Sequence, residues 1–161
     1  MFRANALFVG LFQFTLSVFS FAQPMPEGRL MRFPDVTKDK IVFSYGGDLW
    51  LVSRDGGVAR RVTSHPGQEL FGKFSPDGKW IAFTTMYRNF QICVVPAEGG
   101  TATVLVEGED PSWAPNSRTL IFTRRQSGRN VLSLLDVPTK QVKDVSRSSG
   151  TSSQSQPSWA R

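Results

Sequence analysis

The chain has 161 residues, a formal net charge of +6 and a single cysteine. Its basic residues are scattered and form neither a basic helix nor an arginine-rich arm, which argues against a nucleic-acid-binding protein. Cys93 has no partner for an internal disulfide, and the apolar alternation around it predicts a small buried hydrophobic residue.

The first 22 residues predict an export signal. Arg3 is their only charged residue, a largely apolar stretch follows it, and Ser20-Phe21-Ala22 places small residues where signal peptidase requires them. We therefore expect cleavage after Ala22, a periplasmic or secreted protein, and a linker over residues 23–32. The alternative is an uncleaved membrane anchor, although the apolar stretch is short for a spanning helix and carries four polar residues.

The rest of the chain repeats one pattern with a period near 40 residues. The clearest copy is FSPDGKWIAF at residues 74–83, which returns as WAPNSRTLIF at 113–122. A more diverged copy, PDVTKDKIVF, occupies residues 34–43, and a fourth copy begins at Pro157. A period near 40 in strand-rich sequence predicts the blades of a β-propeller.

Each repeat divides into four short strands. In the second repeat we expect these strands at residues 71–74, 80–85, 91–96 and 101–106. The first repeat matches in order, and the third does so without the two glycines of the last hairpin turn, which predicts another turn type there. No segment after the signal has apolar residues at helical spacing over three turns.

We therefore predict an all-β fold, a partial β-propeller of about three four-stranded antiparallel blades. The expected blades lie at about residues 33–70, 71–110 and 111–156, and the first strand of a fourth lies at 157–161. Propellers usually have four to eight blades, so three blades do not close a ring. We expect a fragment or truncated reading frame. The alternatives are assembly with other copies to complete the ring, or apolar blade faces that stay open.

The residues that define the repeat are expected to have a structural role. They are Phe74, Ser75, Pro76, Asp77, Gly78, Phe83, Trp113, Pro115, Phe122 and Trp159. Trp113 and Trp159 take the place of Phe74 in their repeats. We therefore expect these tryptophans, together with Trp50 and Trp80, to pack between blades.

The sequence offers no set of residues for catalysis, metal binding or cofactor binding. His65 is the only histidine, and its Ser-His-Pro-Gly context predicts a turn between blades rather than a base or a metal ligand. No serine lies in a Gly-x-Ser-x-Gly motif, and no glycine-rich loop leads into a helix. Asp48 and Asp136 flank strands and could line a face of the propeller. We expect no enzyme activity in this chain, no cofactor and no metal, and the binding face stays unknown.

The repeat at residues 74–83 resembles the propeller repeats, of a WD-like kind, in TolB and in tricorn-type proteases. Residues 33–83 are similar to the opening propeller of tricorn-type proteases, whereas 109–118 and 156–159 look more like the TolB propeller. The TolB resemblance implies a periplasmic protein that binds partners of the Tol–Pal envelope system. The tricorn resemblance implies a propeller that filters peptides for a protease domain.

Two functions are therefore expected. The first is an exported, non-catalytic propeller module that binds a protein or peptide in the cell envelope, as TolB does. The second is the N-terminal regulatory or substrate-filtering propeller of a tricorn-type serine protease whose catalytic domain is absent from this chain. The propeller of a prolyl-oligopeptidase-like hydrolase is a third option.

Overall fold

The computed structural model describes residues 30–145 and Trp159. The described part is all-β apart from one residue in a helical turn, and it forms three four-stranded antiparallel sheets. The predicted fold class is therefore confirmed. The expected signal, most of the expected linker and the expected start of a fourth blade, apart from Trp159, lie outside the described residues.

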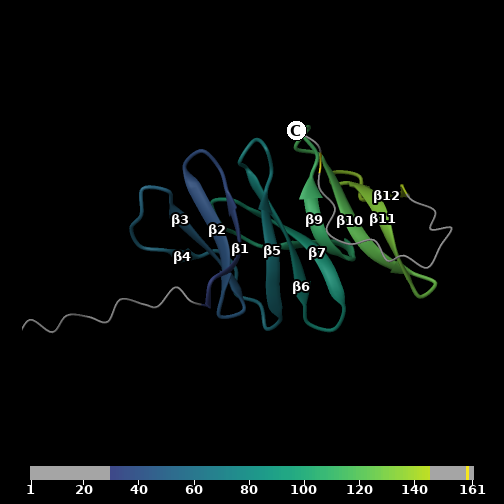
Figure 1. Ribbon diagram of the computed structural model, residues 1–161, viewed down its shortest axis with the longest axis horizontal. Coiled ribbons are helices and arrows are strands. Elements are labelled where there is room, and N and C mark those ends of the chain that lie inside the picture. The colour runs from purple at the N-terminus through teal and green to yellow at the C-terminus, as the bar shows by residue number, and fades with distance from the viewer. Residues whose placement is uncertain (1–29, 146–158, 160–161) are drawn as a thin grey trace, which may run out of the picture.

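Twelve strands make up the three sheets (Figure 1). The first sheet contains β1 (Arg32–Val36), β2 (Lys40–Tyr45), β3 (Asp48–Ser53) and β4 (Arg60–Arg61). The second contains β5 (Gln68–Phe74), β6 (Trp80–Met86), β7 (Phe90–Pro96) and β8 (Thr103–Glu107). The third contains β9 (Glu109–Trp113), β10 (Thr119–Gln126), β11 (Arg129–Asp136) and β12 (Gln141–Asp144).

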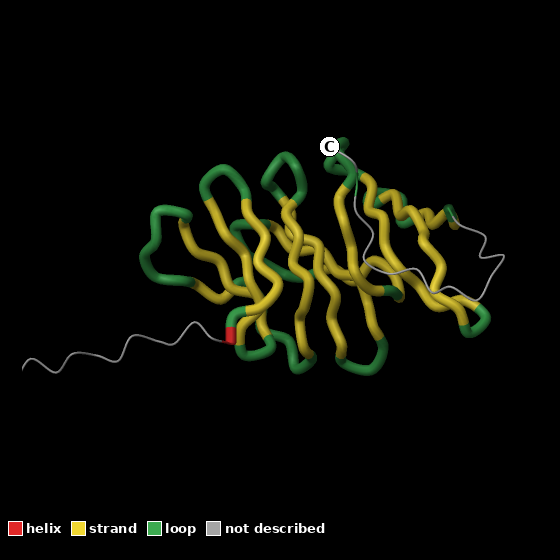
Figure 2. Tube along the Cα trace, in the orientation of Figure 1, coloured by secondary structure: helices red, strands yellow, loops and turns green. Residues whose placement is uncertain are grey.

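Within each sheet the strands neighbour one another in chain order, so each sheet is a simple meander. The three sheets stand side by side like successive propeller blades (Figure 2). Two strands of the second repeat depart from their predicted bounds by more than one residue. β5 begins at Gln68 rather than at residue 71, and β8 begins at Thr103 rather than at residue 101. In the first repeat the last strand, β4, is only two residues long.

The first strand of every blade carries a bulge at the same position. Its pairing with the second strand shifts register at each bulge. At these bulges Phe33, Phe71 and Asp110 have positive φ angles of 53°, 56° and 54°. An extra residue in one strand of an antiparallel pair bends that strand and increases its twist. The bulge is therefore a repeated feature of the fold.

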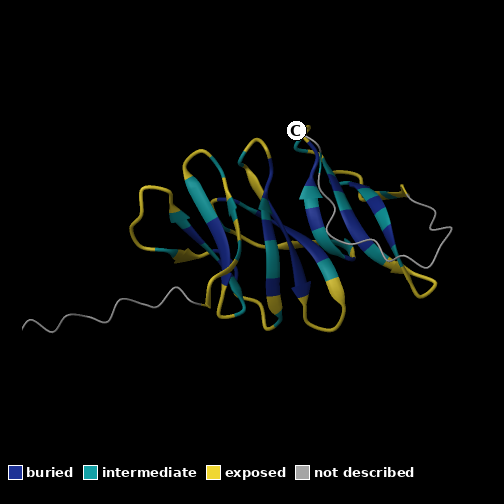
Figure 3. Ribbon diagram, viewed as in Figure 1, coloured by how far each residue is buried: buried dark blue, intermediate teal, exposed yellow. Residues whose placement is uncertain are grey.

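The core lies between the sheets rather than within one of them. The first cluster of buried residues joins blades one and two and is made of Val42, Leu49, Leu51, Val62, Phe74, Ile81, Phe83, Cys93, Val95 and Ala97. The second joins blades two and three and is made of Ala82, Ile92, Val94, Trp113, Leu120, Phe122 and Leu135. Burial is concentrated in the middle of the strands, and the turns are exposed (Figure 3). Each blade therefore shields the apolar face of its neighbour.

The repeat-defining aromatic residues lie mostly at these blade junctions. Phe83 and Phe122 are fully buried, and Phe74 and Trp113 are buried beside them. The Trp113 indole Nε1 donates to the Lys73 carbonyl of the preceding blade at 3.0 Å. Trp159 repeats this contact one blade later, where its Nε1 donates to the Ser112 carbonyl at 3.2 Å.

Two tryptophans depart from the expected packing. The side chain of Trp80 is 41% exposed, so its prediction as a buried residue between blades is wrong. Trp80 begins β6 at the turn, where no neighbouring blade covers it. Trp50 is half-buried, and its Nε1 donates to the Tyr45 carbonyl at 3.0 Å within its own blade.

The Ser-Pro-Asp-Gly turn of blade two is held by side-chain hydrogen bonds. The buried Ser75 hydroxyl donates to Asp77 Oδ1 at 2.6 Å and accepts the Trp80 backbone N–H at 3.0 Å. The Asp77 backbone N–H donates to Ser117 Oγ of blade three at 3.0 Å. Pro76 and Gly78 complete the turn, and the equivalent Pro115 is exposed. In blade three, whose last turn lacks glycine, Lys140 adopts the positive φ of 56°.

Candidate functional site

One end of the blades gathers three hairpin turns, and we call it the hairpin face. It consists of residues 46–47, 87–89 and 127–128, together with the connection 62–67 between the first two blades. In a meander of antiparallel strands, alternate turns fall at the same end. These turns accordingly lie along the lower edge of the molecule in Figures 1 and 2.

Aromatic side chains are exposed on the hairpin face. Tyr87 is 56% exposed and Phe90 is 41% exposed at the β6–β7 hairpin. The Tyr87 ring meets the His65 ring edge-on, with 5.3 Å between centroids, and the Arg88 guanidinium carbon lies 5.9 Å from the Tyr87 centroid. Tyr45 lies on the same face, at the end of β2. Exposed aromatic and arginine side chains are typical of protein-binding surfaces.

Two clefts open between blades one and two and share His65 and Glu69. The inner cleft measures ≈ 430 Å³ and is lined by Leu30, Arg32, Ser44, Tyr45, Gly46, Gly47, Asp48, His65, Pro66, Gly67, Gln68, Glu69 and Leu70. The outer cleft measures ≈ 460 Å³ and is lined by Arg61, Val62, Thr63, Ser64, His65, Glu69, Gly100, Thr101 and Ala102. Ligand sites commonly have this size and occur between structural units.

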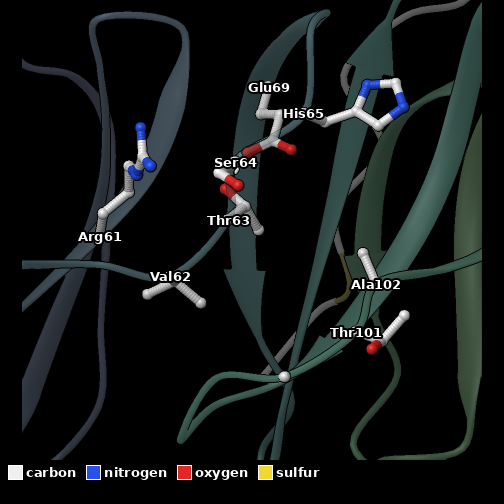
Figure 4. Close-up of a pocket in the computed structure, with 9 residues that line it drawn as sticks. Arg61, Val62, Thr63, Ser64, His65, Glu69, Thr101 and Ala102 are labelled. Carbon is white, nitrogen blue, oxygen red and sulfur yellow. Dashed lines mark hydrogen bonds between the residues drawn. The ribbon is translucent and has the colours of Figure 1, made fainter.

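Glu69 is the buried acid at the junction of the two clefts. Only 1% of the residue is exposed. Its Oε2 accepts hydrogen bonds from the Thr63 hydroxyl and, at 3.3 Å, from the Leu49 backbone N–H. Burial raises the pKa of the Glu69 carboxyl above its usual value, against the opposing effect of these two hydrogen bonds. Figure 4 shows the carboxylate beside Thr63, with Thr101 across the outer cleft.

The structure brings together only some of the polar residues singled out in the sequence. His65 lies in the turn between blades, as predicted, and its Nδ1 accepts the Gly67 N–H at 3.3 Å. Asp48 lines the inner cleft and pairs with Arg61 at 3.3 Å. Asp136 lies in blade three, where hydrogen bonding to Arg118 lowers the pKa of its carboxyl to about 2.

Sequence reasoning missed Glu69, the residue with the most unusual environment. The predicted strand begins at residue 71 and therefore leaves Glu69 outside it. The sequence signal available was a charged residue within the β-compatible run from Gln68 to Phe74. Cys93 is buried and free, as predicted, and burial raises the pKa of its thiol to about 11.

The described residues contain no group of three or more His, Cys, Asp or Glu side chains placed to hold a metal ion. In residues 30–145 no helix has the length and apolar character needed to cross a bilayer.

Comparison with known proteins places this architecture in a family. The model of the tricorn protease N-terminal β-propeller domain matches residues 28–160. The chain belongs to this family. The tricorn protease homolog 2 of Streptomyces coelicolor is 38% identical to it over 73 residues, which are 44% of this chain and 6% of the homolog. A tricorn-like protease N-terminal subunit of Sulfurisphaera tokodaii is 37% identical over 54 residues, which are 34% of this chain and 28% of the subunit.

Solved structures with low sequence identity share the propeller fold. A TolB structure from Agrobacterium tumefaciens has a TM-score of 0.71 at 15% identity, and the match covers 81% of this chain and 50% of that one. The tricorn protease has a TM-score of 0.57 at 22% identity, with 66% and 12% covered. The propeller domain of the trilobed protease from Pyrococcus furiosus has a TM-score of 0.57 at 16% identity, with 73% and 43% covered.

The chain spans a small part of the curated relatives that it matches, between 6% and 28% of their length. The matched region is a propeller, and no catalytic domain is part of the match.

Proposed function

We propose that this chain is part of the opening propeller of an exported, tricorn-type protease system, and that its hairpin face binds the polypeptides that such a protease cleaves. The family match over residues 28–160 and the names of the curated relatives support the tricorn part of this proposal. The predicted signal at residues 1–22 supports export to the periplasm or beyond the cell.

One observation carries the binding role: two exposed aromatic side chains lie at the junction of blades one and two, where Tyr45 lines the inner cleft and the Tyr87 ring contacts His65, which lines both clefts. Tyr87 and Phe90 offer apolar contact area with few rotatable bonds. The neighbouring clefts offer backbone groups, hydroxyls and carboxylates, which suit the polar backbone of an extended peptide. In this proposal the propeller selects polypeptides, and cleavage takes place in a domain outside residues 28–160.

A TolB-like role in binding an envelope protein is the second candidate. The observation that favours it is the TolB structure from Agrobacterium tumefaciens, whose TM-score of 0.71 is higher than that of the tricorn protease. The gene sequence beyond codon 161 separates the two candidates. Further repeats followed by a protease domain favour the first, and a reading frame without any protease domain favours the second.

Peptide binding can be measured by fluorescence anisotropy with a labelled, unstructured casein peptide. The matched pair of variants is Phe90→Ala and Trp80→Ala, because both side chains are 41% exposed. They lie at opposite ends of the β6–β7 pair, about 20 Å apart. We expect Phe90→Ala to weaken binding about fivefold or more and Trp80→Ala to leave it unchanged. Equal effects of the two variants, or no binding by the unmodified chain, would contradict the proposal.

A further inference from the structure

We propose that the inner cleft binds a primary ammonium group of a peptide, supplied by a lysine side chain or by the N-terminus. Glu69, Asp48 and Ser44 form the polar part of this site. The inference rests on the proposed peptide-binding function and adds the chemical group that is recognised.

Glu69 supplies a buried acceptor with spare capacity. Its Oε2 already accepts from the Thr63 hydroxyl and the Leu49 N–H. Among the described residues no hydrogen bond reaches Oε1, and the residue lines the inner cleft. An ionised carboxylate in a buried site gains strongly from a cationic partner that also donates a hydrogen bond.

Ser44 supplies a second acceptor that the fold leaves unused. The residue is 5% exposed, lines the inner cleft, and its hydroxyl has no hydrogen-bond partner in the described part of the chain. In the next blade the equivalent Thr84 hydroxyl accepts the Asp110 backbone N–H at 3.1 Å. The corresponding blade-to-blade bond is thus missing at Ser44. The hydroxyls of Thr85 and Thr123 also lack a partner among the described residues, but Ser44 is the one of the three that lines the inner cleft, where a bound ligand can donate to it.

Asp48 supplies a third acceptor on the wall of the same cleft. Its Oδ2 pairs with Arg61 Nη1 at 3.3 Å, and Arg61 lines the outer cleft rather than the inner one. The charged side chains of the inner cleft are therefore Asp48, Glu69 and Arg32. Because Asp48 is paired with Arg61, Glu69 is the carboxylate of this cleft that has no ion-pair partner among the described residues, and an ammonium group can donate to it.

The next blade junction shows that these acids are not required by the repeat. The Glu69 N–H donates to the Gly47 carbonyl at 2.8 Å, and at the equivalent position the Gly108 N–H donates to the Phe90 carbonyl at 2.9 Å. The same backbone hydrogen bond is made at both positions, but the second position has no side chain. Glu69 is therefore a feature of the first junction alone among the two that the structure describes.

The second junction leaves no room for a side chain at the position equivalent to Glu69. A Cβ atom built on Gly108 would lie 2.6 Å from Phe122 Cδ2. Gln91 stands where the first junction has Asp48. Both carboxylates are thus replaced at the second junction, by a glycine and an amide. The second junction therefore packs without these two carboxylates, so the acidic residues at the first junction are not needed for the blades to pack.

The shape of the inner cleft suits the stem of a lysine side chain. Leu30, Tyr45, Pro66 and Leu70 line it together with the polar residues. Methylene groups pack on such side chains while the charged end reaches the acceptors. The volume of ≈ 430 Å³ is ample for one side chain.

The test uses three labelled heptapeptides of alanine and glycine and the full chain in low-salt buffer. The first is N-acetylated with one central lysine, the second is N-acetylated with norleucine at that position, and the third has norleucine and a free N-terminus. We expect the first or third peptide to bind about tenfold or more tightly than the second. The first and third peptides distinguish a side-chain ammonium from a terminal one.

Variants of the cleft residues test whether the ammonium group binds in the inner cleft. We expect Glu69→Gln to reduce affinity for the preferred peptide about tenfold, and Ser44→Ala and Asp48→Asn to reduce it about threefold each. The matched control is Asp55→Asn, which removes one negative charge from the turn between β3 and β4, at the end of the blades opposite the hairpin face. We expect the control to bind like the unmodified chain. Melting curves verify that each variant is folded. If Glu69→Gln does not fold, the affinities of Ser44→Ala and Asp48→Asn test whether the ammonium group binds in the inner cleft.

Three outcomes would overturn the inference. Equal binding of the acetylated norleucine peptide shows that the face binds peptides without reading an ammonium, and the proposed function then stands alone. An equal loss in Asp55→Asn shows that binding depends only on overall charge. Failure of all three heptapeptides and of the casein peptide contradicts the proposed function itself, and the inference with it.

Discussion

Replacement of Trp113 by phenylalanine tests the packing of one blade against the next. Trp113 is buried between blades two and three, and its Nε1 donates to the Lys73 carbonyl at 3.0 Å. Phenylalanine already fills the equivalent position 74, so the aromatic packing of the fold tolerates it. The substitution therefore removes mainly the hydrogen bond between blades.

The expected loss follows from that single bond. A neutral hydrogen bond contributes about 1 kcal/mol, and leaving the Lys73 carbonyl without its donor adds to this, so Trp113→Phe should lower the free energy of unfolding by about 1–2 kcal/mol. Trp113→Ala also removes most of the buried ring and should cost about 3–5 kcal/mol.

Urea denaturation followed by far-UV circular dichroism measures both values without relying on tryptophan fluorescence. The control is Trp80→Phe, because Trp80 is exposed and no hydrogen bond from its indole reaches another described residue. We expect the control to change the free energy of unfolding by less than about 0.5 kcal/mol. A loss in Trp80→Phe as large as that in Trp113→Phe, or no loss in Trp113→Ala, would refute stacking of the blades through this residue.

Three further predictions concern buried groups. Burial raises the pKa of the Glu69 carboxyl, so between about pH 4.5 and the raised pKa the folded state keeps a proton that the unfolded state has lost. The free energy of unfolding should therefore fall as the pH rises through this range. Glu69→Gln should reduce this pH dependence in melting curves recorded at several pH values. The Cys93 thiol, with a pKa of about 11, should react with Ellman's reagent at neutral pH only after unfolding, and rapid reaction of the folded chain would contradict its burial. Gly108→Ala should lower the free energy of unfolding by about 2 kcal/mol or more, because its φ is 154° and the new Cβ meets the Phe122 ring. Gly128→Ala has open space around it, so its loss in the same urea titration should be smaller.

The central strands of each blade were predictable because their residues repeat at a constant spacing. The FSPDGKWIAF motif marks the end of one strand and the start of the next, and β6 begins at Trp80 as expected. The first strand of each blade was harder to predict. In β5 the bulge at Phe71 breaks the alternation of buried and exposed residues, so the strand was expected to start three residues late.

The candidate site was less accessible from sequence than the fold. Asp48 was recognised as a residue at the end of a strand, but its place beside Ser44 and Glu69 depends on how two blades pack. The run from Gln68 to Phe74 indicates that Glu69 lies in a strand, but its burial comes from the neighbouring blade and cannot be read from that run. Trp80 shows the converse, since a large aromatic residue of the repeat motif is exposed at the start of its strand.

The most direct test of the proposed binding face is an amide NMR titration of the isotope-labelled full chain with the lysine heptapeptide. The account predicts that chemical shifts change at residues 44–49 and 86–90 on the hairpin face. It predicts no change at residues 54–58 and 76–79, which lie in turns at the opposite end of the blades. Changes confined to that opposite end, or no changes at any peptide concentration, would contradict the assignment of the hairpin face as the functional site.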